Sequence, residues 1–260
     1  MEVHAHTHTA PASGGTGRKK WTHYFWEFLM LFLAVFCGFL AENIREHKVE
    51  HNRAKEYARG LITDLGIDTL QLHQLIEQNK KVLTSMDSVS SIVHSGIVDN
   101  KVRGSFYLYS QIGCFSPTVV WNNASLIQLI QSGNLRYFRN VELVDKISAY
   151  YARQDYVRLL NSTDKERRDK TLEIRNRVLK NYYFKGFSSI LPSDTIKIPE
   201  SMMDNLLQLE SSDIHLLNEY ANSFETRKAL INLVIRDTYP KAMYKAQELI
   251  LLLKKEYHLK

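Results

Sequence analysis

The chain has 260 residues, 44% hydrophobic and 24% charged, which is enough for one domain of about 200 residues with a sizeable core plus appendages. Its formal net charge is +6, but charges of both signs are interleaved, as in residues 164–170. This mixing is typical of solvated helix faces and argues against a nucleic-acid partner. Cys37 lies in an apolar run, so we expect no disulfide between it and Cys114.

The first 22 residues form a polar arm. They are rich in Ala, Ser, Gly, Thr and Pro, which predicts disorder. His4, His6 and His8 alternate within the arm, and alternating imidazoles can hold a transition metal. A flexible tail provides no fixed second shell, however, so we predict a solvated arm without a metal.

The most distinctive segment is the apolar run from Tyr24 to Ala41, within a predicted transmembrane helix at residues 23–41. The run is long enough to cross about 27 Å of hydrocarbon as a helix. Phe39 occupies a position where signal-peptide cleavage requires a small residue, which predicts an uncleaved signal-anchor. Ala34 and Gly38 form a small-xxx-small pair, a spacing that lets two such helices dimerise closely.

Basic residues lie on both sides of this segment. Arg18, Lys19 and Lys20 precede it, and Arg45, Lys48, Arg53 and Lys55 follow it, so Lys and Arg counts alone do not set the orientation. The compact triplet beside a short arm favours a cytoplasmic N-terminus. We therefore expect a single-pass protein of the bacterial inner membrane with an extracytoplasmic domain.

After a charged juxtamembrane stalk at residues 42–57, apolar residues recur at alternating spacings of three and four. Nine of eleven stripe positions are apolar, and Asp68 and Asn79 interrupt them. This stripe consists of Ala58, Leu61, Leu65, Asp68, Leu72, Leu75, Asn79, Val82, Met86, Val89 and Val93. It is either one wall of an intramolecular helix bundle or a parallel coiled coil between two chains. Because enough later helices exist to cover it, we favour the bundle.

The remaining chain is also predicted to be helical. We expect helices over residues 105–112, 118–132 and 141–183, a loop over 186–199, and a last helix that begins at the Ser211-Ser212-Asp213 cap and is kinked or divided at Pro240. Strand signals are scarce. The predicted fold class is therefore all-α, with one N-terminal transmembrane helix continuing into an antiparallel bundle of long helices at residues 58–260.

Few residues suggest chemistry. His47, Glu50 and His51 match the H-x-x-E-H pattern of some zinc hydrolases, in which both histidines bind the metal and the glutamate acts as a base. A charged helix produces such spacings by chance, so we predict no catalytic, cofactor-binding or metal-binding residue and no cofactor. The aromatic groups at 106–109 and 182–184 are interpreted as core packing, with the wall of a ligand groove as the alternative.

One block suggests a relationship. Residues 129–140, which include Ser132, Gly133, Asn134 and Leu135, are followed by Leu143, Ile147, Tyr150 and Tyr151. This arrangement resembles a bacterial family of small, single-pass, helical membrane proteins to which no activity is assigned. The resemblance covers residues 20–160 and implies an architecture and a membrane location.

Three functions are compatible with these features. The first is a non-enzymatic, membrane-anchored sensor or scaffold in the cell envelope, which forms a homodimer through Ala34, Gly38 and the Ala58–Val93 stripe. The second is an accessory subunit that packs on another membrane protein. The third, a remote alternative, is a membrane-bound zinc hydrolase that uses His47, Glu50 and His51.

Overall fold

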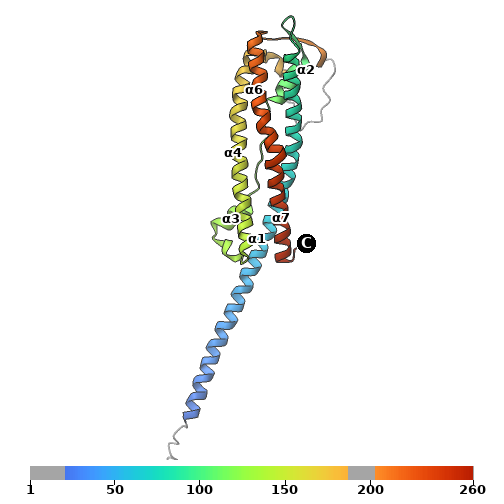
Figure 1. Ribbon diagram of the computed structural model, residues 1–260. Coiled ribbons are helices and arrows are strands. Elements are labelled where there is room, and N and C mark those ends of the chain that lie inside the picture. The colour runs from blue at the N-terminus through green and yellow to red at the C-terminus, as the bar shows by residue number, and fades with distance from the viewer. Residues whose placement is uncertain (1–20, 187–202, 260) are drawn as a thin grey trace, which may run out of the picture. The chain divides into compact units, whose positions relative to one another are not determined.

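The computed structural model describes residues 21–186 and 203–259 (Figure 1). Most of the predicted arm, with its three histidines, and nearly all of the predicted 186–199 loop lie outside these ranges. The chain divides into two compact units, residues 1–52 and residues 53–260. Helix α1 (Trp21–His94) contributes to both.

In the first unit, α1 contains the predicted apolar segment. Within the described residues it is the one helix that is long and apolar enough to cross a membrane, with a mean hydropathy of 2.0 over an 18-residue window. None of that window is buried. Phe28, Phe32 and Phe36 stack along one side, with ring centroids 6.3 and 5.9 Å apart. The helix therefore fits a single-pass membrane anchor.

The second unit is a bundle of long helices, which confirms the predicted all-α class. The part of α1 that begins at Arg53 lies beside α4 (Val141–Val178) and beside α6 (Ile214–Leu233) and α7 (Tyr239–Tyr257) (Figure 1). A π-helical turn, Val234–Thr238, joins α6 to α7 just before Pro240. The predicted division at this proline is thus a widened turn in one continuous helical rod.

The rods do not all alternate in direction. Lys146 near the start of α4 pairs with Glu248 in α7 at 2.5 Å, whereas Arg167 further along α4 donates to the Thr226 carbonyl in α6 at 2.8 Å. The α6–α7 rod is therefore antiparallel to α4. α1 and α4 run in the same direction, because the early part of the stripe packs on the start of α4 and its late part packs near Val178.

All eleven residues of the stripe are buried inside the chain's own bundle. The stripe is therefore one wall of an intramolecular bundle, the alternative that we favoured from the sequence. It does not present a free surface to a second chain. Its two polar members have partners within the chain. Asn79 Nδ2 donates to the Leu75 carbonyl at 2.9 Å, and the Asp68 carboxylate accepts hydrogen bonds from α4.

A return segment explains how α1 and α4 are parallel. Helix α3 spans Ala124–Gln131, so the predicted start at residue 118 was wrong. Residues 115–123, which form this return segment, are instead non-helical. Two α1 carboxylates bind backbone N–H groups near the end of the segment. Asp68 accepts from Asn122 N at 2.8 Å, and Asp64 accepts from Ser125 N at 2.9 Å. Asp64 thus caps α3 from another helix, a long-range contact that local sequence patterns do not contain.

At the other end of the bundle, a small sheet ends α4 earlier than predicted. Strand β1 (Lys101–Arg103) pairs antiparallel with β2 (Leu206–Gln208), and Leu179 forms an isolated bridge with Leu209. Because Leu179 is extended, α4 stops at Val178 and not at residue 183. Helix α2 (Gly104–Gly113) follows β1, as predicted for residues 105–112, and the last helix begins at the predicted Asp213 cap.

The two aromatic groups pack together at this same end. Tyr107 is fully buried, and its ring centroid lies 5.5 Å from that of Tyr183 and 5.3 Å from that of Phe184. The Tyr107 hydroxyl donates to the Gln208 carbonyl at 2.7 Å and accepts from Lys180 N at 3.1 Å. These contacts match the core-packing interpretation.

Candidate functional site

The H-x-x-E-H residues lie on one face of α1 in the first unit. His47 Nδ1 is 3.7 Å from Glu50 Oε2, with the histidine side chain about half exposed. Within residues 21–186 and 203–259, no group of three or more His, Cys, Asp or Glu side chains gathers where a metal ion could bind. The zinc-hydrolase alternative therefore gains no third ligand from the described part of the chain.

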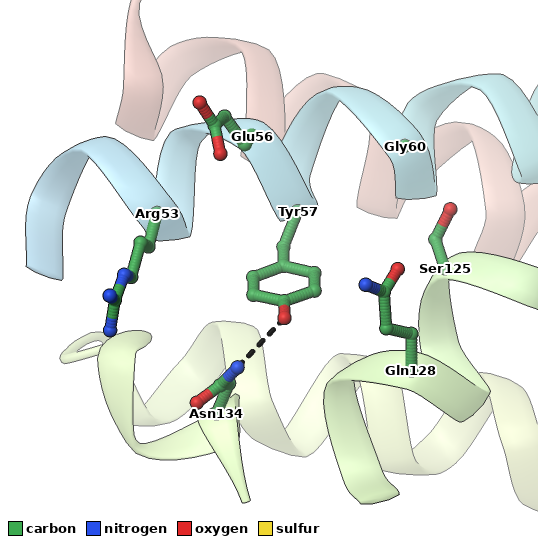
Figure 2. Close-up of a pocket in the computed structure, with 7 residues that line it drawn as sticks. All are labelled: Arg53, Glu56, Tyr57, Gly60, Ser125, Gln128 and Asn134. Carbon is green, nitrogen blue, oxygen red and sulfur yellow. Dashed lines mark hydrogen bonds between the residues drawn. The ribbon is translucent and has the colours of Figure 1, made fainter. Parts of the chain in front are cut away.

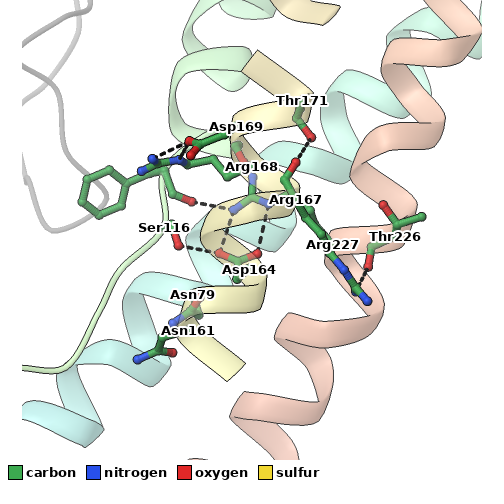
Figure 3. A network of polar contacts seen from close by, with 12 residues as sticks. Asn79, Ser116, Asn161, Asp164, Arg167, Arg168, Asp169, Thr171, Thr226 and Arg227 are labelled. Carbon is green, nitrogen blue, oxygen red and sulfur yellow. Dashed lines mark hydrogen bonds and ion pairs between the residues drawn. The ribbon is translucent and has the colours of Figure 1, made fainter. Parts of the chain in front are cut away.

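The most buried charged side chain in the second unit holds separate parts of the fold together (Figure 3). Arg227 is fully buried in α6 and donates to both carboxylate oxygens of Asp164 in α4, at 3.0 Å each. It also donates to the carbonyls of Gly113 at 2.7 Å and Phe115 at 3.0 Å, while the Ser116 hydroxyl donates to Asp164 at 2.5 Å. This one guanidinium therefore joins α6 and α4 to the start of the return segment.

A second buried polar group surrounds Asp68. Its carboxylate accepts hydrogen bonds from the Tyr150 hydroxyl at 2.8 Å and from Gln154 Nε2 at 3.3 Å, besides that from Asn122 N. Burial, the largest effect, raises the pKa of Asp68 above its ordinary 3.8, although these hydrogen bonds oppose the change. Its donors come from α4 and the return segment, so this carboxylate also holds the fold together.

The feature best suited to ligand binding is a polar pocket of about 410 Å³ between α1 and α3 (Figure 2). Its walls carry a guanidinium, a carboxylate, a phenol, two amides and a hydroxyl. The lining residues are Arg53, Glu56, Tyr57, Gly60, Ser125, Gln128 and Asn134. None of these residues is predicted as a site residue from the sequence.

The block that carries the family resemblance contributes Asn134 to the lining of this pocket. Gly133 adopts a left-handed φ of +66°, which ends α3 as predicted. Asn134 Nδ2 then donates to the Tyr57 hydroxyl oxygen at 2.7 Å (Figure 2), and that oxygen lies 3.5 Å from Ser132 Oγ. Because Ser132 Oγ donates to the Gln128 carbonyl at 2.6 Å, the chain of hydrogen bonds fixes Tyr57 against α3.

Beside the pocket, two guanidinium groups approach one phenol. Arg53 Nη1 donates to the Tyr137 hydroxyl oxygen at 3.1 Å, and the Arg53 and Arg136 guanidinium carbons lie 5.9 and 5.4 Å from the Tyr137 ring centroid. Hydrogen bonds, first from Arg136 and then from Arg53, lower the pKa of Tyr137. This end of the pocket therefore has a positive potential.

The pocket also requires a close approach of two helices. A Cβ placed on Gly60 would meet Ser125 Oγ at 2.5 Å and Ser125 Cβ at 3.1 Å, both closer than a normal contact. Gly66, six residues further along the same helix, has no atom of the described residues within 4 Å of such a Cβ. Gly60 is therefore the residue that lets α1 and α3 meet at this wall.

Searches of the chain against protein-family models, curated proteins and solved structures find no match. The role of the pocket is therefore inferred from its own residues and their geometry. The sequence did contain a signal for it, because the distinctive 129–140 block supplies Asn134 to its lining and Tyr137 beside it. The α1 partners of that block lie 77 and 84 residues away in the chain, a pairing that sequence spacing does not indicate.

Proposed function

We propose that the chain is a membrane-anchored, non-catalytic helical-bundle protein of the bacterial cell envelope that acts as a sensor or a scaffold. One observation carries this proposal: the apolar window of α1 is entirely unburied, whereas the unit from Arg53 onward buries its own stripe. An apolar helix of this length, with no protein side chains covering it, requires a lipid environment.

The arrangement of buried charges supports a non-catalytic role. Asp164 and Arg227 bind each other, and Asp68 is surrounded by donors that hold the return segment and α4. Perturbed groups at an active site usually face a cleft where a substrate can reach them. Asp68 and the Arg227 side chain that pairs with Asp164 are instead at most 1% exposed, and their hydrogen-bond partners lie on other helices, so these groups hold helices together.

The anchor also suggests how the chain associates. Among the described residues no atom lies within 4 Å of a Cβ built on Gly38, so the small face formed by Ala34 and Gly38 is open to another helix. We propose that two chains dimerise through this face. The alternative occupant is a span of another membrane protein, for which this chain would be an accessory subunit.

Reporter-enzyme fusions test the location and orientation. An alkaline phosphatase fused after Lys260 is expected to be active and a fluorescent protein at that position dark, because the domain is placed outside the cytoplasm. The opposite pair of results would place the domain in the cytoplasm and remove the envelope assignment. Crosslinking in membranes then separates the partners: self-crosslinks through the span support the homodimer, and crosslinks to one other protein support the accessory-subunit alternative.

A further inference from the structure

The polar pocket holds two opposite charges that do not pair with each other. Arg53 and Glu56 are three residues apart on the pocket face of α1, and neither forms an ion pair with a residue in the ranges 21–186 and 203–259. Four other oppositely charged pairs at this spacing do close, at 2.5 to 2.7 Å, each with the acidic residue first: Glu42–Arg45, Glu77–Lys80, Asp155–Arg158 and Glu225–Lys228. In Figure 2, the Arg53 and Glu56 side chains point away from each other.

The separation has a cause in the fold. Arg53 turns toward Tyr137, where Arg136 also lies, so two guanidinium groups share one phenol without a carboxylate between them. Neighbouring guanidinium groups attract an oxyanion, and their planar N–H donors suit carboxylate or phosphate oxygens. The Arg53 end of the pocket is therefore suited to a negative group.

The rest of the wall offers the complementary contacts. Glu56 is exposed and supplies a carboxylate acceptor, while the Gln128 amide points toward Tyr57 in Figure 2. The Tyr57 hydroxyl is fixed by Asn134, so it is preorganised. Residues three apart on a helix have Cβ atoms about 5–6 Å apart, so the two charged side chains start close enough for one small ligand to bridge them.

We propose that this pocket binds a zwitterionic ligand in which a two-carbon chain is esterified to a phosphate at one end and carries a primary ammonium at the other. Arg53, supported by Arg136, binds the phosphate oxygens, and Glu56 accepts N–H donors from the ammonium. Gln128 and Tyr57 contact the link between them. This site is the input of the proposed sensor and to that extent rests on the proposed function, although binding itself does not require the anchor.

Two sources carry this chemistry: soluble phosphoethanolamine and the headgroup of phosphatidylethanolamine. A choline compound is a matched control, because its quaternary ammonium has the same charge but no N–H to donate to Glu56. Inorganic phosphate and ethanolamine each supply one half of the ligand. The four probes therefore separate recognition of both charges from attraction to one.

Calorimetric titration of the purified full chain in a phosphate-free detergent solution tests the proposal. Phosphoethanolamine is expected to bind at least about tenfold more tightly than phosphocholine, inorganic phosphate or ethanolamine, since each charged hydrogen bond contributes a factor of this size. Glu56→Gln should remove the preference over phosphocholine, and Arg53→Gln should weaken every phosphate-containing probe. Glu77→Gln, which opens a closed pair on the same helix outside the pocket, is the matched control and should bind like the wild type.

Equal binding of phosphoethanolamine and phosphocholine, no saturable binding, or unchanged binding in both pocket variants would overturn the proposal. Circular dichroism of each variant establishes that it is folded. Titration in nanodiscs then identifies the source. A weaker apparent affinity for soluble phosphoethanolamine in phosphatidylethanolamine discs than in phosphatidylcholine discs supports the lipid headgroup, and equal affinities support the soluble compound. Failure of binding leaves the anchor and its topology untouched, so the two proposals fail separately.

Discussion

The pair formed by Arg227 and Asp164 gives the sharpest test of how the bundle is held together. Arg227 is fully buried, and the Asp164 side chain is 11% exposed. Asp164→Ala would leave the guanidinium with two carbonyl acceptors and no counter-charge, which is expected to cost about 3–5 kcal/mol of unfolding free energy. Arg227→Met would leave the carboxylate with only the Ser116 hydroxyl and is expected to cost a similar amount.

The double variant, Asp164→Ala with Arg227→Met, removes both charges together. Because no uncompensated charge then stays buried, its loss should be about 2–3 kcal/mol smaller than the sum of the two single losses. Urea unfolding of the full chain in mild detergent, followed by far-ultraviolet circular dichroism, measures all four proteins. Single losses below about 1 kcal/mol, or strictly additive losses, would refute the assignment of this pair as the central tie between α4, α6 and the return segment.

Three further variants test other contacts by the same unfolding measurement. Gly60→Ala should destabilise the bundle by about 1–3 kcal/mol because its Cβ meets Ser125, whereas the control Gly66→Ala should stabilise it by up to about 1 kcal/mol; equal effects would contradict the close approach. Gly133→Ala should cost about 1–2 kcal/mol because φ is +66° there, and an unchanged midpoint would contradict that turn. The raised pKa of Asp68 means that the folded state binds its proton more tightly than the unfolded state, so stability should fall as the pH rises from about 4 through that raised pKa. Asp68→Asn should flatten this dependence, and the same slope in both proteins would show that another group causes it.

The long-period features were predictable from the sequence because they repeat. The stripe was recognised from its alternating spacing, and every one of its residues is buried. The end of α3 was recognised from a single glycine, since a left-handed residue has a strong local signature. In each case, the cause of the structure lies within a few residues of the structure itself.

What was missed depends on contacts between distant residues. The start of α3 was placed too early because its limit depends on distant acceptors. Asp64 binds the Ser125 N–H group of α3 from 61 residues earlier in the chain, and Asp68 binds the Asn122 N–H group of the segment before α3 from 54 residues earlier. The two strands have three residues each, too few for an alternating pattern to appear. The pocket was missed for the first reason, because its walls come from α1 and, far along the chain, from α3 and Asn134.

Membrane insertion of the apolar segment is the claim on which the account depends most. Membranes from cells that express the full chain should be washed at alkaline pH, which removes peripheral proteins, beside membranes with a Leu31→Arg, Val35→Arg double variant. The wild type is predicted to stay in the membrane pellet, and the variant to leave it, because each arginine at the centre of a span costs about 2.5–3.5 kcal/mol. Release of the wild-type chain by the wash, or retention of both proteins to the same extent, would contradict the membrane anchor.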